Sequence, residues 1–238
     1  MFLNEGISPV PLSEVPGACI LGTTVLQISD HRMRPKSLYD LLAPLYARFL
    51  PGFFERLNTR AVQRVGAGAP ATILEVGVGP GRLLSEIAAK GKARVIGVDI
   101  SRKMLGYARQ AVRDRKGNAK VVQASGLALP FPDASFEAVV SVLFLGVLSE
   151  REIQPALNEL TRVLAPGGRI VIASLKFTSP ILRRLWMTAY QAIPDLVGKV
   201  RPVNIDAQLE PAGLRVIKEE DIPEFTGIRM LTLMRVRA

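Results

Sequence analysis

Three glycines separated by single residues follow an apolar run that contains one carboxylate. The run is Ile73–Val76 with Glu75 inside it, and the glycines are Gly77, Gly79 and Gly81. Because glycine lacks a side chain, such a loop lets a ligand approach the backbone closely. A buried strand, a glycine-rich turn and a helix start in this order are how α/β proteins hold adenosine-containing cofactors. The segment therefore predicts a site for a cofactor of that kind.

A second carboxylate, Asp99, ends the next apolar run at Val95–Val98. Its two oxygens can accept hydrogen bonds from both hydroxyls of a ribose. Arg82 occupies the position where a dinucleotide-binding G-x-G-x-x-G loop has its last glycine, and Glu75 would repel a pyrophosphate. The same Glu75 suits the ammonium group of an amino acid. These residue types favour an adenosine cofactor with an ammonium group and disfavour a dinucleotide oxidoreductase.

The elements that must position these residues alternate along the chain from residue 37 onward. Apolar spacing predicts helices over 37–47, 53–65, 81–90, 101–115, 149–164, 180–193 and 203–211, and strands over 72–76, 93–99, 119–124, 136–142, 169–175, 213–220 and 227–236. Ser101 and Ser149 are expected to cap the helices that follow them, the latter in a capping box with Glu152. Alternating strands and helices imply a parallel sheet with right-handed crossovers. The last two strands have a short connection and are therefore expected to be antiparallel.

Four segments in this order resemble the motifs of class I S-adenosylmethionine-dependent methyltransferases. They are E-V-G-V-G-P-G at 75–81, V-D-I-S with Met104-Leu105 over 98–105, L-P-F-P-D-A-S-F-E at 129–137, and E-L-T-R-V-L-A-P-G-G at 159–168. The resemblance covers residues 37–238 and implies an α/β fold: a Rossmann-like, doubly wound, mostly parallel seven-stranded sheet with an antiparallel strand near one edge and a helical lid. It also implies S-adenosylmethionine as cofactor. This agrees with Glu75, because the molecule carries an ammonium group and no phosphate.

The resemblance extends to individual residues of the cofactor site. The matching positions are Glu75, Gly77, Gly79, Gly81, Asp99, Ile100, Met104, Ser125, Gly126 and Leu127. In the family, the acidic residue at the position of Asp99 binds the ribose, and the residue after it packs on the adenine. Ser125 departs from the pattern, since relatives usually have an aspartate there that accepts a hydrogen bond from the adenine amine. A serine hydroxyl can accept that bond without the carboxylate's charge, and Gln123 could assist.

Methyl transfer from a sulfonium is an in-line displacement, so an enzyme mainly aligns the reactants and excludes water. A general base is needed only when the acceptor must lose a proton. The only histidine, His31, precedes the predicted domain, which leaves Tyr39 and Tyr46 as the candidate catalytic residues. Their segment resembles the Y-D-x-x-A-x-x-Y lid of quinone C-methyltransferases and phospholipid N-methyltransferases. Half-buried tyrosines on an amphipathic helix are the structural alternative.

Substrate character is expected to come from two apolar stretches, the helical lid at 37–65 and the insert at 176–212. The candidate substrate-binding residues are Phe144, Leu145, Arg183 and Trp186. An apolar pocket with arginines at its rim suits a lipid- or quinone-like acceptor that is reached from an anionic membrane surface. Packing of the lid against the sheet would require the same composition and is the alternative.

Length and composition narrow the class of protein. The 238 residues carry a net charge of +10 and 48% of them are hydrophobic, so we expect one folded domain at 37–238 after an appendage at 1–36. No apolar run reaches the roughly 18–20 residues that a membrane span needs. The single cysteine, Cys19, excludes an internal disulfide, disfavours a metal cluster and fits a reducing cytoplasm. Deletion of residues 1–32 is expected to leave folding and cofactor affinity intact.

Positive charge gathers in residues 101–120 and 176–202 and suits anionic partners such as nucleic acid or lipid headgroups, although solvated helix faces give the same pattern. An RNA methyltransferase is one alternative, but Ser141–Phe144 does not match the N/D-P-P-Y/F motif of exocyclic-amine methylation. A cofactor-binding protein without catalysis is another, because the domain lacks histidine. The interpretation that the residues favour is a methyltransferase acting on a small or amphipathic hydrophobic acceptor.

Overall fold

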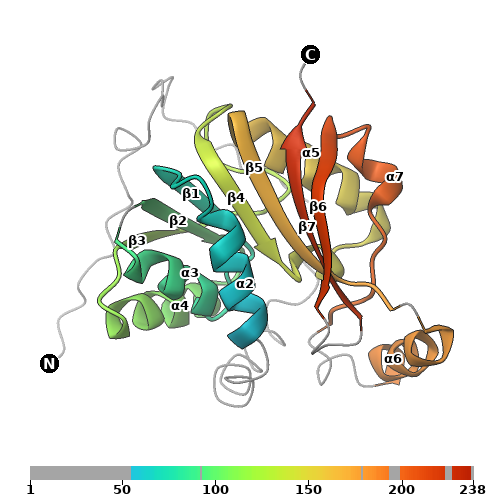
Figure 1. The fold of residues 1–238 in the computed structure, drawn as a ribbon. Coiled ribbons are helices and arrows are strands. Elements are labelled where there is room, and N and C mark those ends of the chain that lie inside the picture. The colour runs from blue at the N-terminus through green and yellow to red at the C-terminus, as the bar shows by residue number, and fades with distance from the viewer. Residues whose placement is uncertain (1–54, 92, 178, 193–198, 223–226, 237–238) are drawn as a thin grey trace, which may run out of the picture.

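The computed structural model describes residues 55–91, 93–177, 179–192, 199–222 and 227–236. At its centre lies a seven-stranded sheet in the order β3-β2-β1-β4-β5-β7-β6 (Figure 1). The strands are β1 (Thr72–Val76), β2 (Arg94–Asp99), β3 (Ala119–Gln123), β4 (Phe136–Val142), β5 (Leu164–Leu175), β6 (Leu214–Ile222) and β7 (Ile228–Arg235). Among these strands, β7 runs antiparallel to both of its neighbours, β5 and β6. The predicted fold class, a mostly parallel sheet with an antiparallel strand near one edge, is confirmed.

Helices cover both faces of this sheet (Figure 1). They are α2 (Glu55–Val65), α3 (Arg82–Ala89), α4 (Arg102–Asp114), α5 (Glu150–Val163), α6 (Pro180–Ala192) and α7 (Asp206–Leu209), with a 3₁₀ turn η2 (Phe144–Val147). On one face, α2, α3 and α4 contribute Leu57, Leu84 and Leu105 to an apolar core. On the other, α5 and α7 contribute Leu157 and Leu209 to a second core. Because the sheet is buried on both sides, its central strands are continuous apolar runs.

Two helix starts follow directly from local sequence. Ser101 is the N-cap of α4 and accepts a hydrogen bond from the amide of Met104 at 3.3 Å. The amide of Ser149 donates to the Glu152 carboxylate at 2.7 Å, in the capping box that begins α5. Both predicted caps are confirmed.

The start of β5 differs from the sequence prediction. The strand begins at Leu164 rather than at residue 169. Leu164 pairs with Phe136, and the register then shifts at an irregularity before Ala138 pairs with Arg169. The proline–glycine segment Pro166–Gly168, which precedes the predicted strand, therefore lies inside an irregular strand.

The predicted helix at 203–211 is also shorter in the structure. α7 spans only Asp206–Leu209, and the segment before it follows the sheet, where the amide of Val203 donates to the carbonyl of Leu175 at 3.0 Å. The appendage at 1–36 and the lid helix at 37–47 lie outside the described residues, as do positions 53–54 of the helix predicted at 53–65.

The order of the strands decides where a ligand can bind. β1 pairs with β2 on one side and with β4 on the other, and all three run parallel. The connections leave the sheet in opposite directions at this point, which is where open α/β sheets bind ligands beyond the carboxyl ends of their strands. The glycine loop follows β1 at this edge, η2 follows β4, and α6 follows β5 (Figure 1).

Candidate cofactor site

The loop after β1 is held close to β2 by its backbone. The amides of Gly77 and Val78 both donate to the carbonyl of Val98, at 2.8 and 3.1 Å. Gly77, Gly79 and Gly81 have φ angles of 77°, 52° and 81°, in the left-handed region that glycine adopts without strain. A β-carbon at Gly79 would have no atom within 4 Å, so the middle of the loop faces open space. The loop therefore presents bare backbone to a ligand.

Asp99 ties the loops after β1 and β2 together. Its Oδ2 accepts a hydrogen bond from the amide of Gly79 and its Oδ1 accepts one from the amide of Ser101, each at 2.9 Å. The residue is only partly exposed. The carboxylate thus stands beside the open glycine loop.

Glu75 is buried on β1, with 3% of its surface exposed. Its Oε2 has no hydrogen-bond partner among the described residues. Burial raises the pKa of this carboxyl well above its usual value, and the charges of Asp99 and Glu86 raise it further. A buried polar atom without a partner requires an explanation, and the ammonium group of a bound amino acid supplies one. Together with the open glycine loop, this orphaned oxygen fits S-adenosylmethionine.

The loops after β2 and β3 form the other end of the site. Ile100 follows Asp99 and leaves 57% of its surface exposed, which suits a residue that packs on an adenine. The Ser125 hydroxyl accepts a hydrogen bond from the amide of Leu127 at 3.2 Å. Gln123 Nε2 donates to the carbonyl of Ile100 at 3.0 Å, so this side chain supports the Ile100 loop. Met104, which was predicted to bind the cofactor, is buried on α4 with 1% of its surface exposed.

Replacement of Ser125 with aspartate is expected to tighten S-adenosylmethionine binding about two- to tenfold. A carboxylate accepts the adenine amine more strongly than a hydroxyl does, and it can keep the bond from the Leu127 amide. Calorimetric titration of Ser125→Asp measures the change. S-adenosylhomocysteine is titrated as well. It carries the same adenine, so its affinity for the variant should increase by the same factor. If the variant binds both ligands no more tightly than wild type does, Ser125 does not contact the adenine.

Glu75→Gln is expected to have opposite effects on stability and on cofactor affinity. A raised folded-state pKa means that the folded protein holds this proton more tightly than the unfolded chain. The contribution of this carboxyl to stability is therefore fully present below its pKa in the unfolded chain, about 4.3. It is lost as the pH rises toward the pKa in the folded protein. Glutamine cannot ionise, so the ligand-free variant should melt at a higher temperature than wild type at neutral pH. It should also bind S-adenosylmethionine at least about tenfold more weakly, because the ammonium loses its charged partner.

Melting curves between pH 4 and 8 and calorimetry at neutral pH measure the two effects of Glu75→Gln. Glu210→Gln removes a charge from an exposed position and should change neither. A variant that melts lower than wild type at neutral pH, or that binds the cofactor normally, contradicts the role given to Glu75.

Phe144 lies between the two loops of the cofactor site. A β-carbon at Gly77 would come within 2.8 Å of Phe144 Cβ, and one at Gly126 within 2.4 Å of Phe144 Cζ. Phe144 was predicted to bind substrate, and the structure places it against the cofactor loops. Leu145, predicted for the same role, is 1% exposed and belongs to the core that α5 covers.

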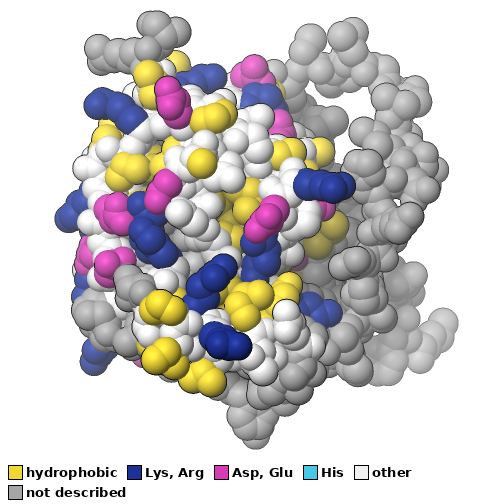
Figure 2. Space-filling view, turned by 90° about the vertical axis from the view of Figure 1, so that its right-hand side faces the viewer, with side chains coloured by type: hydrophobic (Ala, Val, Ile, Leu, Met, Phe, Trp, Pro, Cys, Tyr) yellow, Lys and Arg dark blue, Asp and Glu magenta, His cyan; other side chains and the backbone are white. Residues whose placement is uncertain are grey.

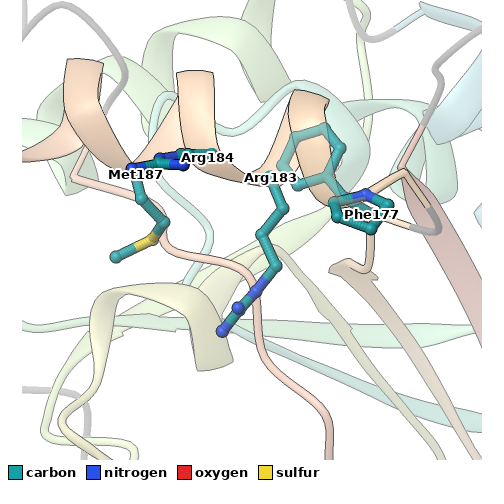
Figure 3. A pocket seen from close by; sticks show the side chains of 5 residues that line it. Phe177, Arg183, Arg184 and Met187 are labelled. Carbon is teal, nitrogen blue, oxygen red and sulfur yellow. The ribbon is translucent and has the colours of Figure 1, made fainter.

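A hollow of about 450 Å³ opens beside α6 (Figure 3). It is lined by Phe177, Pro180, Arg183, Arg184 and Met187. Arg183 and Met187 extend from the same side of α6 in Figure 3, so a cationic and an apolar side chain share one wall. Trp186 is not in this lining: its Nε1 donates to the carbonyl of Val200 at 2.9 Å and its ring lies 5.6 Å from that of Phe177. Of the predicted substrate residues, Arg183 therefore borders the hollow and Trp186 anchors α6.

Arg162 is an organising residue that the sequence alone did not single out. Its guanidinium donates to the carbonyls of Leu129 and Phe131, at 3.0 and 2.8 Å. It also pairs with Asp133 at 2.8 Å and with Glu159 at 2.7 Å. One side chain thus joins the L-P-F segment to α5. Both segments were recognised as motifs in the sequence, but neither motif indicates which other segment it contacts.

The remaining sequence predictions concern the catalytic tyrosines, metal binding and membrane spans. Tyr39 and Tyr46 lie outside the described residues. The described part of the chain contains no cluster of His, Cys, Asp and Glu side chains that could hold a metal ion. None of its helices has the length and apolar character needed to cross a membrane.

A doubly wound sheet with an antiparallel β7, a glycine loop after β1 and a carboxylate ending β2 define the class I methyltransferase fold. Residues 73–168 match the family described as "Methyltransferase domain". The [4+2]-cyclase SpnF has the same fold, with a TM-score of 0.71 at 17% identity over 85% of this chain and 95% of that one. The N-methyltransferase NodS from Bradyrhizobium japonicum, solved with S-adenosylhomocysteine, gives a TM-score of 0.64 at 16% identity over 83% of this chain and 98% of that one.

Two relatives by sequence are nearer. A demethylmenaquinone methyltransferase from Thermus thermophilus is 38% identical over 143 residues, which cover 60% of this chain and 62% of that protein. A ubiquinone/menaquinone biosynthesis C-methyltransferase from Syntrophotalea carbinolica is 29% identical over 79% of this chain and 88% of that protein. The chain thus matches less than two thirds of the Thermus relative's length. Residues 73–168 match a methyltransferase domain, and the chain is similar in sequence and fold to S-adenosylmethionine-dependent methyltransferases.

Proposed function

We propose that this chain methylates a ring carbon of a quinone-type lipid in its hydroquinone form. The similarity to proteins named as demethylmenaquinone and ubiquinone/menaquinone C-methyltransferases carries the proposal. In such a reaction a carbon–carbon bond forms, the sulfur–methyl bond breaks, and the ring carbon loses its proton. S-adenosylmethionine, when bound, supplies the methyl group on a positively charged sulfur.

The residues of the chain hold and orient the two reactants. Glu75 would hold the ammonium group, Asp99 the ribose hydroxyls, and Ile100 and Ser125 the adenine. Their contribution to the rate is alignment and exclusion of water, because a sulfonium is already a good leaving group. No acid–base residue is required at this end of the site.

The acceptor would occupy the hollow beside α6. Phe177 and Met187 give it apolar walls, which suit an aromatic ring. Arg183 and Arg184 supply positive charge on the same lining. A cation beside a hydroxyl favours its ionised form, and an ionised hydroquinone is a better carbon nucleophile. Tyr39 and Tyr46 remain the candidates for receiving the ring proton.

We also propose peripheral contact between α6 and an anionic membrane. Ile181 and Leu185, one helical turn apart, leave 73% and 63% of their surfaces exposed, and Leu182 beside them leaves 40%. In Figure 2 hydrophobic and basic side chains lie side by side at the lower end of the molecule, where α6 stands in Figure 1. An exposed apolar stripe with arginines and no acidic residue suits a surface of anionic lipid. Flotation with phosphatidylglycerol vesicles, compared with phosphatidylcholine vesicles, tests this contact.

Transfer of a tritiated methyl group from S-adenosylmethionine tests the proposed reaction. The acceptors are a short-chain demethylmenaquinol, a phospholipid vesicle and total tRNA. Label in the menaquinol fraction, reduced at least about tenfold in a double variant Arg183→Gln with Arg184→Gln, is the expected result. Label in tRNA with none in the menaquinol would favour an RNA methyltransferase. No label in any fraction, with calorimetric binding of the cofactor intact, would favour a protein that binds the cofactor without catalysis.

A further inference from the structure

The turn that follows β4 begins with a strained residue. Leu143 has a φ angle of 61°, in the left-handed region that branched and bulky side chains avoid. Such a conformation costs free energy and persists only where the surrounding structure imposes it, as it often does at functional sites. Leu143 stands directly before Phe144, so its backbone sets the direction of that side chain.

Neighbouring segments impose this conformation through hydrogen bonds on both sides of Phe144. The amide of Leu143 donates to the carbonyl of Ala173 on β5 at 2.8 Å. Beyond Phe144, the amide of Arg201 donates to the carbonyl of Gly146 at 2.9 Å. The guanidinium Nε of Arg201 donates to the carbonyl of Leu148 at the same distance. The turn is thus fixed at its start by the sheet and at its end by Arg201.

The result is a phenyl group that reaches from one cofactor loop to the other. A β-carbon at Gly77 would clash with Phe144 Cβ at 2.8 Å, and a β-carbon at Gly126 would clash with Phe144 Cζ at 2.4 Å. Glycine at both positions leaves room for the ring. Phe144 is only partly buried, so part of its surface remains exposed.

The two loops that Phe144 joins are assigned to opposite ends of the cofactor. Gly77 follows Glu75, which we assign to the ammonium group of the methionine part, and Gly126 follows Ser125, which we assign to the adenine. The positively charged sulfur joins the methionine part to the ribose that carries the adenine, so it lies between these two ends. We propose that Phe144 offers its ring face to this charge and makes the site prefer S-adenosylmethionine over its uncharged product. The inference rests on the cofactor assignment and is independent of the methyl acceptor.

The physical basis is the attraction between a cation and the face of an aromatic ring. S-adenosylmethionine carries a sulfonium, whereas S-adenosylhomocysteine has a neutral thioether and otherwise the same groups. Ordinary packing against the ring contributes to both ligands alike. The ratio of the two affinities therefore isolates the effect of charge, which a purely structural role of Phe144 would not change.

Calorimetric titration of the full chain with S-adenosylmethionine, S-adenosylhomocysteine and sinefungin tests the inference. Sinefungin carries a charged amine where the cofactor has its sulfonium. In Phe144→Leu the two cationic ligands are expected to lose about three- to tenfold in affinity, and S-adenosylhomocysteine less than about twofold. Incorporation of 3,5-difluorophenylalanine at position 144 keeps the shape of the ring and weakens its negative face, so it should reproduce the charge-dependent loss in a protein that folds normally.

Val147→Ala is the matched control, because Val147 lies in the same turn with 40% of its surface exposed. It should leave all three affinities unchanged. Equal losses for the charged and uncharged ligands, or an unchanged difluorophenylalanine protein, would overturn the inference. Because no methyl acceptor is present, failure of the proposed quinone reaction would leave this result standing.

Discussion

Asp99→Asn is expected to weaken S-adenosylmethionine binding by at least about a hundredfold. The two oxygens of Asp99 accept from two different amides, those of Gly79 and Ser101. Asparagine has one oxygen, so its amino group must face one of these N–H donors. Hydrogen bonds to a charged group contribute about 1.5–3 kcal/mol each, and an unpaired donor adds its desolvation cost. The variant therefore loses a ribose acceptor and the support of the glycine loop together.

Calorimetry measures the affinity of Asp99→Asn, and circular dichroism melting shows whether it folds. Asp114→Asn is the control, because it removes the same charge from an exposed position at the end of α4. This control should bind the cofactor like wild type. If Asp99→Asn keeps its affinity within about threefold of wild type, the carboxylate does not hold the ribose and the site must lie elsewhere on the sheet.

Asp99 also illustrates what the sequence was able to predict. It ends a run of apolar residues on a strand buried on both faces, and such strands are recognisable from composition alone. It lies beside the glycine loop because β1 and β2 are adjacent parallel strands that end at the same edge of the sheet. Its hydrogen bond to Gly79 follows from that geometry. Local patterns therefore predicted the cofactor loops and the strands that carry them.

Contacts between distant segments could not be predicted in the same way. Nothing local in Phe144 indicates that its ring meets Gly77 and Gly126, since the contact depends on how the turn after β4 is held by β5 and Arg201. Leu145 was predicted, together with Phe144, to bind substrate. A 3₁₀ turn points successive side chains in different directions, so Leu145 enters the core while Phe144 stays at the site.

The proposed acceptor site also combines features that the sequence predicted with contacts that it did not predict. Composition indicated an apolar insert with arginines, and the structure divides its residues between two roles. Arg183 and Met187 border the hollow, while Trp186 bonds to Val200 and fixes α6 to the body of the protein. Helical periodicity alone did not separate these roles, because it does not say which face of a protruding helix is covered.

Gly81→Ala is expected to lower the stability of the protein by about 2–5 kcal/mol. Gly81 begins α3 with a φ angle of 81°, and its β-carbon would lie 2.4 Å from the Cα of Ala108 on α4. The left-handed backbone costs alanine about 1–2 kcal/mol, and overlap with a packed neighbour adds about 1–3 kcal/mol. Because the obstacle is backbone, no side-chain rotation relieves it. For a domain of this size the melting temperature should fall by roughly 4–20 °C.

Gly213→Ala separates the two causes of that loss. Gly213 has a φ angle of 67°, but a β-carbon there would have no atom within 4 Å. This variant should carry the backbone strain alone and lose only about 1–2 kcal/mol. Chemical denaturation of both proteins gives the two free energies of unfolding. If Gly81→Ala is no less stable than Gly213→Ala, the close approach of α3 and α4 at this glycine does not constrain the loop, and the position of the cofactor site would depend on β1 and β2 alone.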